Sequence, residues 1–272
     1  MMPKGLPKPA TPTRQVRAAL ICLWPDRILF IGQLDQVAPH RHAAAVCLVA
    51  IEGELRVRIP PERSWWAGRS ALIPAGRTHA LDLRNSLTAV FYNEPHRPYY
   101  QRLSARDRHE PTFGLPVEDD LRETLSAFYS REQIKHPNIP SELERTLAEA
   151  LEVYAQAPAL DIRIEKIINR VQEDLTQNYP LSDLATTVSL SPSRLQHLFL
   201  SEVGVPLRRF RTWTRFRRAL ELVATGASFT EAALAAGFAS STHFSHAFKA
   251  MFGVSATSVL GGSPNPRFMM FI

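Results

Sequence analysis

The chain has 272 residues and a hydrophobic fraction of 45%, which is enough for two domains with ordinary cores. Its net charge is +6, and residues 160–272 hold 12 Lys and Arg against 8 Asp and Glu, so a polyanionic partner suits that half best. Two cysteines exclude a disulfide scaffold, and the longest apolar run, the nine residues from Ala43 to Ile51, is too short to span a bilayer.

Residues 1–14 are rich in proline and lysine and contain no apolar core of the kind that a signal peptide needs. We expect a disordered arm there, on a cytoplasmic protein with no membrane partner.

Residues 15–100 alternate short apolar runs with turn residues, which is typical of a β-sandwich or barrel. The turn signals include Trp24-Pro25-Asp26, Glu52-Gly53-Glu54 and Pro60-Pro61. The predicted strands are Val16–Leu23, Arg27–Leu34, Ala45–Ile51, Glu54–Ile59, Ser70–Ile73 and Thr88–Tyr92.

Residues 101–159 become helical, with two apolar stripes at helical spacing between 118 and 157. The second stripe consists of Leu143, Leu147, Leu151 and Tyr154. We expect these helices to couple the two halves of the chain and to form a homodimer. The alternative is that the stripe packs only on its own barrel.

Residues 160–260 contain two helix-turn-helix signals, Leu181 to Gly204 and Ser228 to Gly253. In each, a short helix with a small central residue precedes a turn and a helix whose apolar residues repeat at i, i+3 and i+4. A helix from Leu207 to Thr225 joins them, with Pro206 at its start and Gly226 at its end. At about 1.5 Å per residue it spans about 28 Å, so the two recognition helices could enter successive major grooves. Residues 261–272 are predicted to be a tail.

The polar positions of these helices are candidates for DNA contact. Gln196 is the best single base reader, because glutamine can pair bidentately with adenine. Arginines at spacings of three and four lie on one face of the joining helix and suit phosphate contact, although a solvated charged face is the plain alternative. The candidates are Ser193, Arg194, Gln196, His197, Arg208, Arg211, Arg215, Ser241, Thr242, His243, His246 and Lys249.

Residues 160–260 resemble the DNA-binding domain of AraC-type transcriptional regulators. The resemblance is carried by Leu184-Ala185, Ser191 through Phe199, Gly204, Pro206, Phe210, Arg217-Arg218-Ala219, Ala235-Ala236-Gly237-Phe238, Phe244 and Ala247-Phe248-Lys249. The chain departs from the family pattern where His197 and His246 replace an arginine often found in the recognition helices. It departs again at Ala233 and at Ser255-Ala256-Thr257.

The β-rich part has a pattern of its own. His40-Arg41-His42, followed by Gly68, five residues and Pro74-Ala75-Gly76-Arg77-Thr78-His79, resembles the two motifs of the cupin barrel over residues 35 to 95. His40 and His42, two apart on a strand, would point to one face, and the resemblance brings His79 beside them.

Three imidazoles suit one divalent transition metal, zinc, nickel, copper or iron; the alternative is a metal-free pocket for an organic ligand. The glutamate that the resemblance implies as a fourth ligand is replaced here by Val46 or Cys47. We expect Cys47 to be a buried apolar residue rather than a ligand.

The predicted fold class is therefore α+β multidomain: a cupin-like jelly-roll barrel, coupling helices and an all-α tandem helix-turn-helix domain. The predicted function is a transcriptional regulator, not an enzyme, that binds double-stranded DNA and senses a small molecule or metal, with RNA polymerase as a partner if it activates. Two other classes stay open: a metal-dependent cupin enzyme fused to a DNA-binding module, and a constitutive DNA-binding dimer with a non-sensing barrel.

Overall fold

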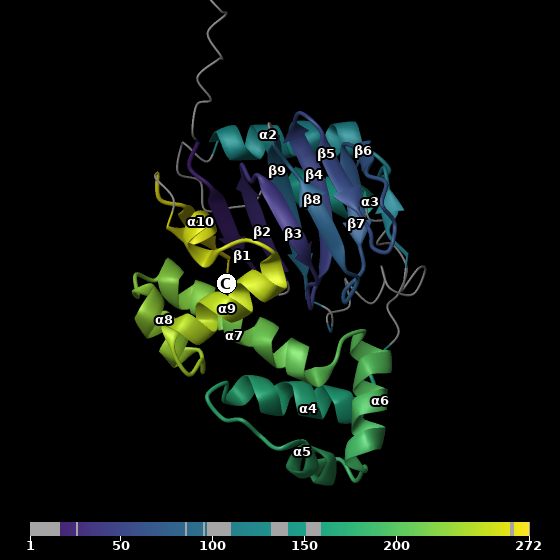
Figure 1. Ribbon diagram of the computed structural model, residues 1–272, viewed down its shortest axis with the longest axis vertical. Coiled ribbons are helices and arrows are strands. Elements are labelled where there is room, and N and C mark those ends of the chain that lie inside the picture. Colours follow the sequence, from purple (N-terminus) through teal and green to yellow (C-terminus); the bar gives the residue numbers. More distant parts are fainter. Residues whose placement is uncertain are drawn as a thin grey trace, which may run out of the picture.

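The computed structural model describes residues 17–94 apart from 26 and 85, residue 96, and residues 110–131, 141–150, 159–261 and 264–271. A β-rich domain lies above a domain made of helices, and the end of the chain returns to the boundary between them (Figure 1). The predicted arm at residues 1–14 and the predicted segments 101–109 and 151–158 lie outside the described residues. Within the described ranges, no helix is long and apolar enough to cross a membrane.

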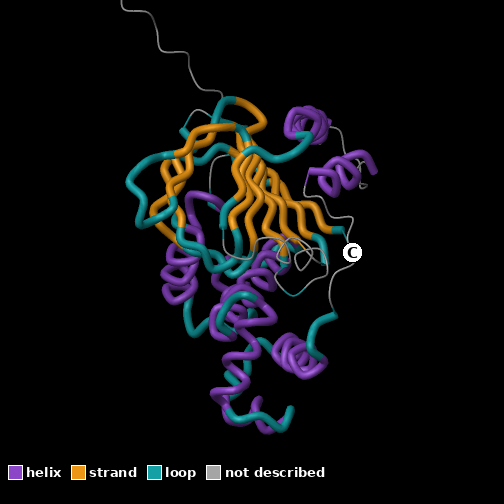
Figure 2. Tube along the Cα trace, turned by 90° about the vertical axis from the view of Figure 1, so that its right-hand side faces the viewer, coloured by secondary structure: helices purple, strands orange, loops and turns teal. Residues whose placement is uncertain are grey.

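The β-rich domain consists of two facing sheets, so the predicted barrel-like class is confirmed. The larger sheet has the order β10-β7-β4-β9-β2-β1-β11 and the smaller has the order β3-β8-β5-β6. Figure 2 shows the strands in these two layers. The strands are β1 (Leu20–Leu23), β2 (Arg27–Gly32), β3 (Gln36–His40), β4 (Ala45–Glu52), β5 (Leu55–Arg58), β6 (Trp66–Gly68), β7 (Ser70–Ile73), β8 (His79–Asp82), β9 (Leu87–Asn93), β10 (Thr112–Phe113) and β11 (Arg267–Met270).

Alternation along the strands of the larger sheet divides its apolar side chains between two cores. Phe30, Val46 and Val90 face the smaller sheet and fill the space between the layers. Their neighbours Leu29 and Cys47 face the opposite side, where the coupling helices lie. Both faces of the larger sheet are therefore buried, which explains why its strands read as nearly continuous apolar runs.

Five strands were absent from the sequence prediction: β3, β6, β8, β10 and β11. Their sequences lack a clear apolar alternation, and β3 contains Pro39, which is typical of turns. The predicted tail at 261–272 contains β11, which pairs in parallel with β1 from Leu20 opposite Arg267 to Leu23 opposite Met270. Beyond β11, the Phe271 ring stacks on Trp24 with 4.7 Å between ring centroids.

The coupling helices α2 (Glu118–Arg131) and α3 (Ser141–Ala150) cover the outer face of the larger sheet. Leu143 and Leu147 are each only 2% exposed in the single chain, packed with Leu121 and Leu125 over that sheet. These two residues of the predicted dimer stripe are already buried within the single chain, which favours the alternative that the stripe packs on its own barrel. Leu151 and Tyr154 lie outside the described residues.

The helical domain contains the two predicted helix-turn-helix units. Its helices are α4 (Ile162–Glu173), α5 (Leu181–Thr187), α6 (Pro192–Val203), α7 (Leu207–Ala224), α8 (Phe229–Ala235), α9 (Ser241–Phe252) and α10 (Ala256–Leu260). Ser191 and Ser240 cap α6 and α9 by accepting a backbone N–H three residues later. Both helices end at a glycine in the left-handed region, Gly204 and Gly253.

Candidate functional site

Three histidines meet between the sheets at the end of the barrel that faces the helical domain. His40 ends β3 and pairs with His79 at the start of β8. His42 follows β3 in a loop rather than on a strand, which corrects the prediction that His40 and His42 share one strand face. The Nε2 atoms of His40 and His42 are 2.8 Å apart, and the potential ligand nitrogens of all three residues lie within 4.8 Å of one another.

Two backbone carbonyls orient these rings. His40 donates its Nδ1–H to Ala38 O over 2.8 Å, and His79 donates its Nδ1–H to Arg77 O over 3.0 Å. This arrangement leaves each Nε2 with a lone pair that points to the centre of the cluster. His79 Nε2 and His42 Nδ1 are buried and have no hydrogen-bond partner among the described residues.

Burial keeps the cluster neutral. Desolvation lowers the pKa of His40 to about 4 and that of His79 to about 3. It also lowers the pKa of His42 well below its usual value, and the repulsion that the Arg209 cation exerts, and that a protonated His40 or His79 would exert, acts in the same direction. Protons therefore compete with a metal ion for these nitrogens only well below pH 6. Histidines with the ordinary pKa would already become protonated near pH 6.

The donor set fits a metal ion. Three neutral imidazole nitrogens, two of them fixed by carbonyl oxygens on the far side of the ring, make up the usual protein contribution to an open zinc or transition-metal site. Cys47 is excluded as a fourth ligand, because it faces the core under α2 and burial raises the pKa of its thiol to about 12. Val46 points to the histidine side instead and adds no donor.

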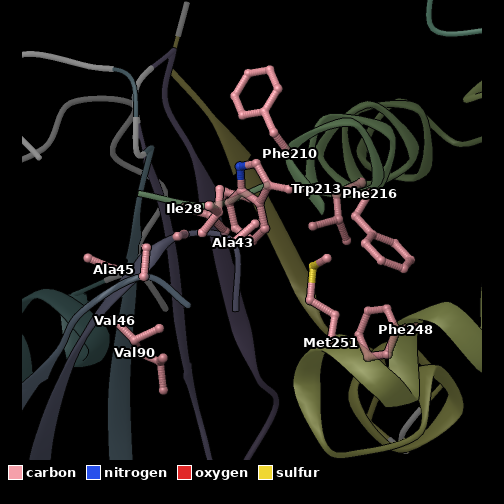
Figure 3. Packing of buried hydrophobic residues seen from close by; sticks show 14 of the residues in the cluster. Ile28, Ala43, Ala45, Val46, Val90, Phe210, Trp213, Phe216, Phe248 and Met251 are labelled. Atoms are coloured by element: carbon pink, nitrogen blue, oxygen red, sulfur yellow. The ribbon is translucent and has the colours of Figure 1, made fainter. Parts of the chain in front are cut away.

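An apolar cavity of about 50 Å³ adjoins the cluster. His40 and His42 form its polar edge, and both domains supply its walls. From the helical domain come residues of α7, α9, α10 and the turn between the last two: Leu220, Phe248, Phe252, Val254, Val259 and Leu260. Figure 3 shows the barrel side chains Val46 and Val90 on one side and the helical side chains Phe216 and Phe248 on the other, with Trp213 reaching toward the barrel.

Polar contacts join the domains beside this cavity. The buried Glu94 carboxylate accepts hydrogen bonds from Trp213 Nε1 at 2.9 Å and from Arg217 Nη1 at 3.0 Å. Arg217 also donates to Trp24 O, and Arg209 Nη1 donates to Arg41 O at 2.6 Å. No local signal in the sequence distinguished Arg209 and Arg217 from the other arginines of α7, because their partners are about 120 or more residues away in the chain.

The recognition helices present their polar candidates to solvent. On α6 and α9 the apolar residues Leu195, Phe199, Phe244 and Phe248 are buried, as the periodicity predicted. The opposite faces are exposed, and they carry Ser193, Arg194, Gln196, His197, Ser241, Thr242, His243, His246 and Lys249.

The predicted phosphate-binding arginines divide into two kinds. Arg208 is exposed and lies beside Gln196 and His197 along one groove. Arg211 and Arg215 are half-buried instead, and they donate to the carbonyls of Tyr179 at 2.6 Å and Leu175 at 2.9 Å. Both arginines therefore hold the segment that leads into α5. Their spacing along α7 did not reveal this role, because the carbonyls that they bind lie in another part of the chain.

This fold and site define a class: a two-domain protein in which a histidine-containing barrel is packed on a tandem helix-turn-helix domain. Residues 184–261 match the model of a helix-turn-helix domain family. Over 99 residues the chain is 35% identical to the uncharacterized HTH-type transcriptional regulator YidL of Escherichia coli, covering 36% of this chain and 33% of that protein. Over 124 residues it is 29% identical to the arabinose operon regulatory protein of Escherichia coli, covering 44% and 42%.

A solved structure resembles the chain over both domains. ToxT from Vibrio cholerae O395, bound to (E)-4-(8-methylnaphthalen-1-yl)but-3-enoic acid, has a TM-score of 0.56 at 14% identity and covers 89% of this chain and 98% of that one. The sequence matches span less than half the length of the curated relatives, and the structural likeness shows the fold alone. Residues 184–261 are a helix-turn-helix domain of the AraC type.

Proposed function

We propose that this protein is a transcriptional regulator that binds double-stranded DNA in a sequence-specific way and senses a ligand in its barrel. The observation that carries the proposal is the pair of recognition helices, α6 and α9, whose polar faces are both exposed, in two motifs that the single helix α7 joins. A single chain can then bind two successive half-sites. The AraC-type domain and the regulators among the relatives support the same function.

For the sensing site we propose one divalent transition metal held by His40, His42 and His79. When bound, the metal would supply a fixed double positive charge and an open coordination position. The neutral rings, their carbonyl partners and the unpartnered His79 Nε2 support this assignment. The adjoining apolar cavity would take the apolar part of an organic effector, in keeping with the aromatic acid in the ToxT structure.

A sensing role is favoured over a metal-dependent enzyme by the chemistry of the cavity wall. Among the described residues that line the cavity there is no carboxylate, lysine or cysteine, and burial raises the pKa of the one hydroxyl there, that of Tyr92, so it is a poor proton donor and base near neutral pH. A site with three neutral ligands and apolar walls suits the holding of an ion or molecule better than its conversion.

The test has a DNA arm and a barrel arm. The full chain is used to select duplexes from a random pool, and the enriched duplex is then measured against random DNA by fluorescence anisotropy. We expect tighter binding to the enriched duplex; equal binding to both would remove the sequence-specific regulator. Zinc uptake measured by calorimetry, with His79→Ala as the control, tests the metal site. If no barrel ligand changes the affinity for DNA, the constitutive alternative replaces the sensing role.

A further inference from the structure

The C-terminal end of the second recognition helix rests directly on the histidine cluster. Gly253, which ends α9, accepts a hydrogen bond from Ala38 N–H through its carbonyl at 3.3 Å. Just before it, the Phe252 ring lies with its centroid 5.3 Å from that of His42. The last residue of a DNA-reading helix and the glycine that caps it therefore contact the strand and loop that carry two of the proposed metal ligands.

Only glycine fits at this contact. A Cβ on Gly253 would lie 2.6 Å from Ala38 O and 2.7 Å from His40 Nδ1, and the residue has a φ of +72° that other residues rarely adopt. His40 thus has the α9 terminus on its Nδ1 side and His42 on its Nε2 side. The ring has little space to move without displacing one of them.

A bound metal would require such a movement. The two Nε2 atoms of His40 and His42 are 2.8 Å apart and share a hydrogen bond. Two nitrogens on one tetrahedral zinc lie about 3.3 Å apart, because each is about 2.0–2.1 Å from the metal. Loading the site therefore breaks this hydrogen bond and separates the two rings by about 0.5 Å.

Both directions of that separation lead to the end of α9. If His40 moves, its Nδ1 edge approaches Gly253. If His42 moves, its ring meets Phe252 and Tyr92, whose centroids are 5.3 and 5.1 Å away and 5.7 Å from each other. Packed interiors respond to such small shifts by changing to another arrangement rather than by compressing.

We propose that metal uptake by His40, His42 and His79 is transmitted through Phe252 and Gly253 to α9, and so changes the binding of DNA by the second motif. The inference rests on the proposed metal site and adds its route of regulation. Because α9 is one helix of 12 residues, a displacement of its end moves the reading residues that it carries from Ser241 to Lys249.

The experiment uses the full chain, freed of metal with EDTA, and zinc chloride as the probe. Hydrogen exchange followed by mass spectrometry should show altered protection after zinc addition in the peptides that cover Ala38 and Phe252. Anisotropy with the enriched duplex should show at least a fivefold change in Kd on adding zinc. Because the exchange measurement needs no variant, it tests the contact even if a substitution fails to fold.

The variants separate this route from a general loosening of the domain contact. Phe252→Ala should still take up one equivalent of zinc and should reduce the zinc effect on Kd to less than twofold. Phe271→Ala is the matched control, since its ring stacks on Trp24 where the segment after the helical domain joins the larger sheet, away from the histidines, and it should keep the fivefold effect.

The outcomes distinguish the two proposals. Zinc uptake with unchanged protection at the end of α9, an unchanged Kd, or a full zinc effect in Phe252→Ala would overturn this route and leave the metal site in place. Failure of the wild-type chain to take up zinc or nickel would overturn the metal site and this inference together. DNA binding without sequence preference would overturn the regulator itself.

Discussion

Acid should destabilise the metal-free protein through its buried histidines. The folded-state pKa values, about 4 for His40 and about 3 for His79, lie below the ordinary value of 6.5. As the pH falls below 6.5, the unfolded chain binds protons on these rings while the folded chain does not. The stability that these residues contribute is therefore present above pH 6.5 and is lost as the pH falls toward the folded values.

The size of the loss follows from the pKa values. At pH 5 the unfolded rings are mostly protonated and the folded ones are not, so each ring costs about 2 kcal/mol relative to pH 7. The two rings are only 4% and 1% exposed, so solvent screening does not reduce this figure much. Together they cost roughly 4 kcal/mol, a large share of the ~5–15 kcal/mol that stabilises a typical domain. His42 acts in the same direction.

The assay is urea unfolding of the full chain with EDTA, followed by tryptophan fluorescence at half-unit steps between pH 7 and pH 5. His79→Gln removes one titrating ring, so the slope of unfolding free energy against pH should decrease by about one proton. His246→Gln, the same substitution on the exposed face of α9 and away from the cluster, is the matched control. A loss below about 1 kcal/mol in the wild type, or the same slope in His79→Gln, would refute the argument that burial keeps these rings neutral.

Four further results are expected. Gln196→Ala should cost about 1–3 kcal/mol on the enriched duplex and much less on random DNA, and equal losses by anisotropy would contradict base reading. Arg208→Ala should weaken binding to all duplexes alike and reduce the salt slope by about one, whereas Arg215→Ala should lower the melting temperature, because its Nε holds a backbone carbonyl. Glu94→Gln should destabilise the chain by about 2 kcal/mol in urea unfolding, because the buried Arg217 is left with only the partly exposed Glu221 as its counter-charge; an unchanged midpoint would show that the pair adds nothing.

The helical half was predictable because its signals are local. The joining helix, predicted from Leu207 to Thr225, runs from Leu207 to Ala224. Caps, apolar periodicity and C-terminal glycines all act within one or two turns, so a sequence window contains them completely. The buried and exposed faces of α6 and α9 followed for the same reason.

The barrel was predictable only in part, because its short strands depend on distant partners. β8 has four residues and is defined by pairing with β3 and β5. The strand β11 forms by pairing with the edge strand β1, which lies nearly 250 residues earlier in the chain. The resemblance to the cupin motifs brought the three histidines together, although apolar patterns had failed to predict β3 and β8, the strands beside them. It could not place His42 beyond the strand end.

The contacts between the domains are the part of the structure that links a ligand to DNA, and no local pattern shows them. Both recognition helices end in a glycine that lies on the histidine-bearing rim: Gly253 against His40, and Gly204 with its carbonyl 3.4 Å from where a Cβ on Gly76 would lie. Gly76 belongs to the turn that leads into His79, and its N–H donates to His42 O at 2.9 Å. A change at the histidines would therefore have a short backbone route to the ends of both recognition helices, and at Gly253 that route leaves no space for a larger residue. A barrel that served only as a scaffold could pack on the helical domain at any surface, whereas a barrel that senses must contact the helices that read DNA.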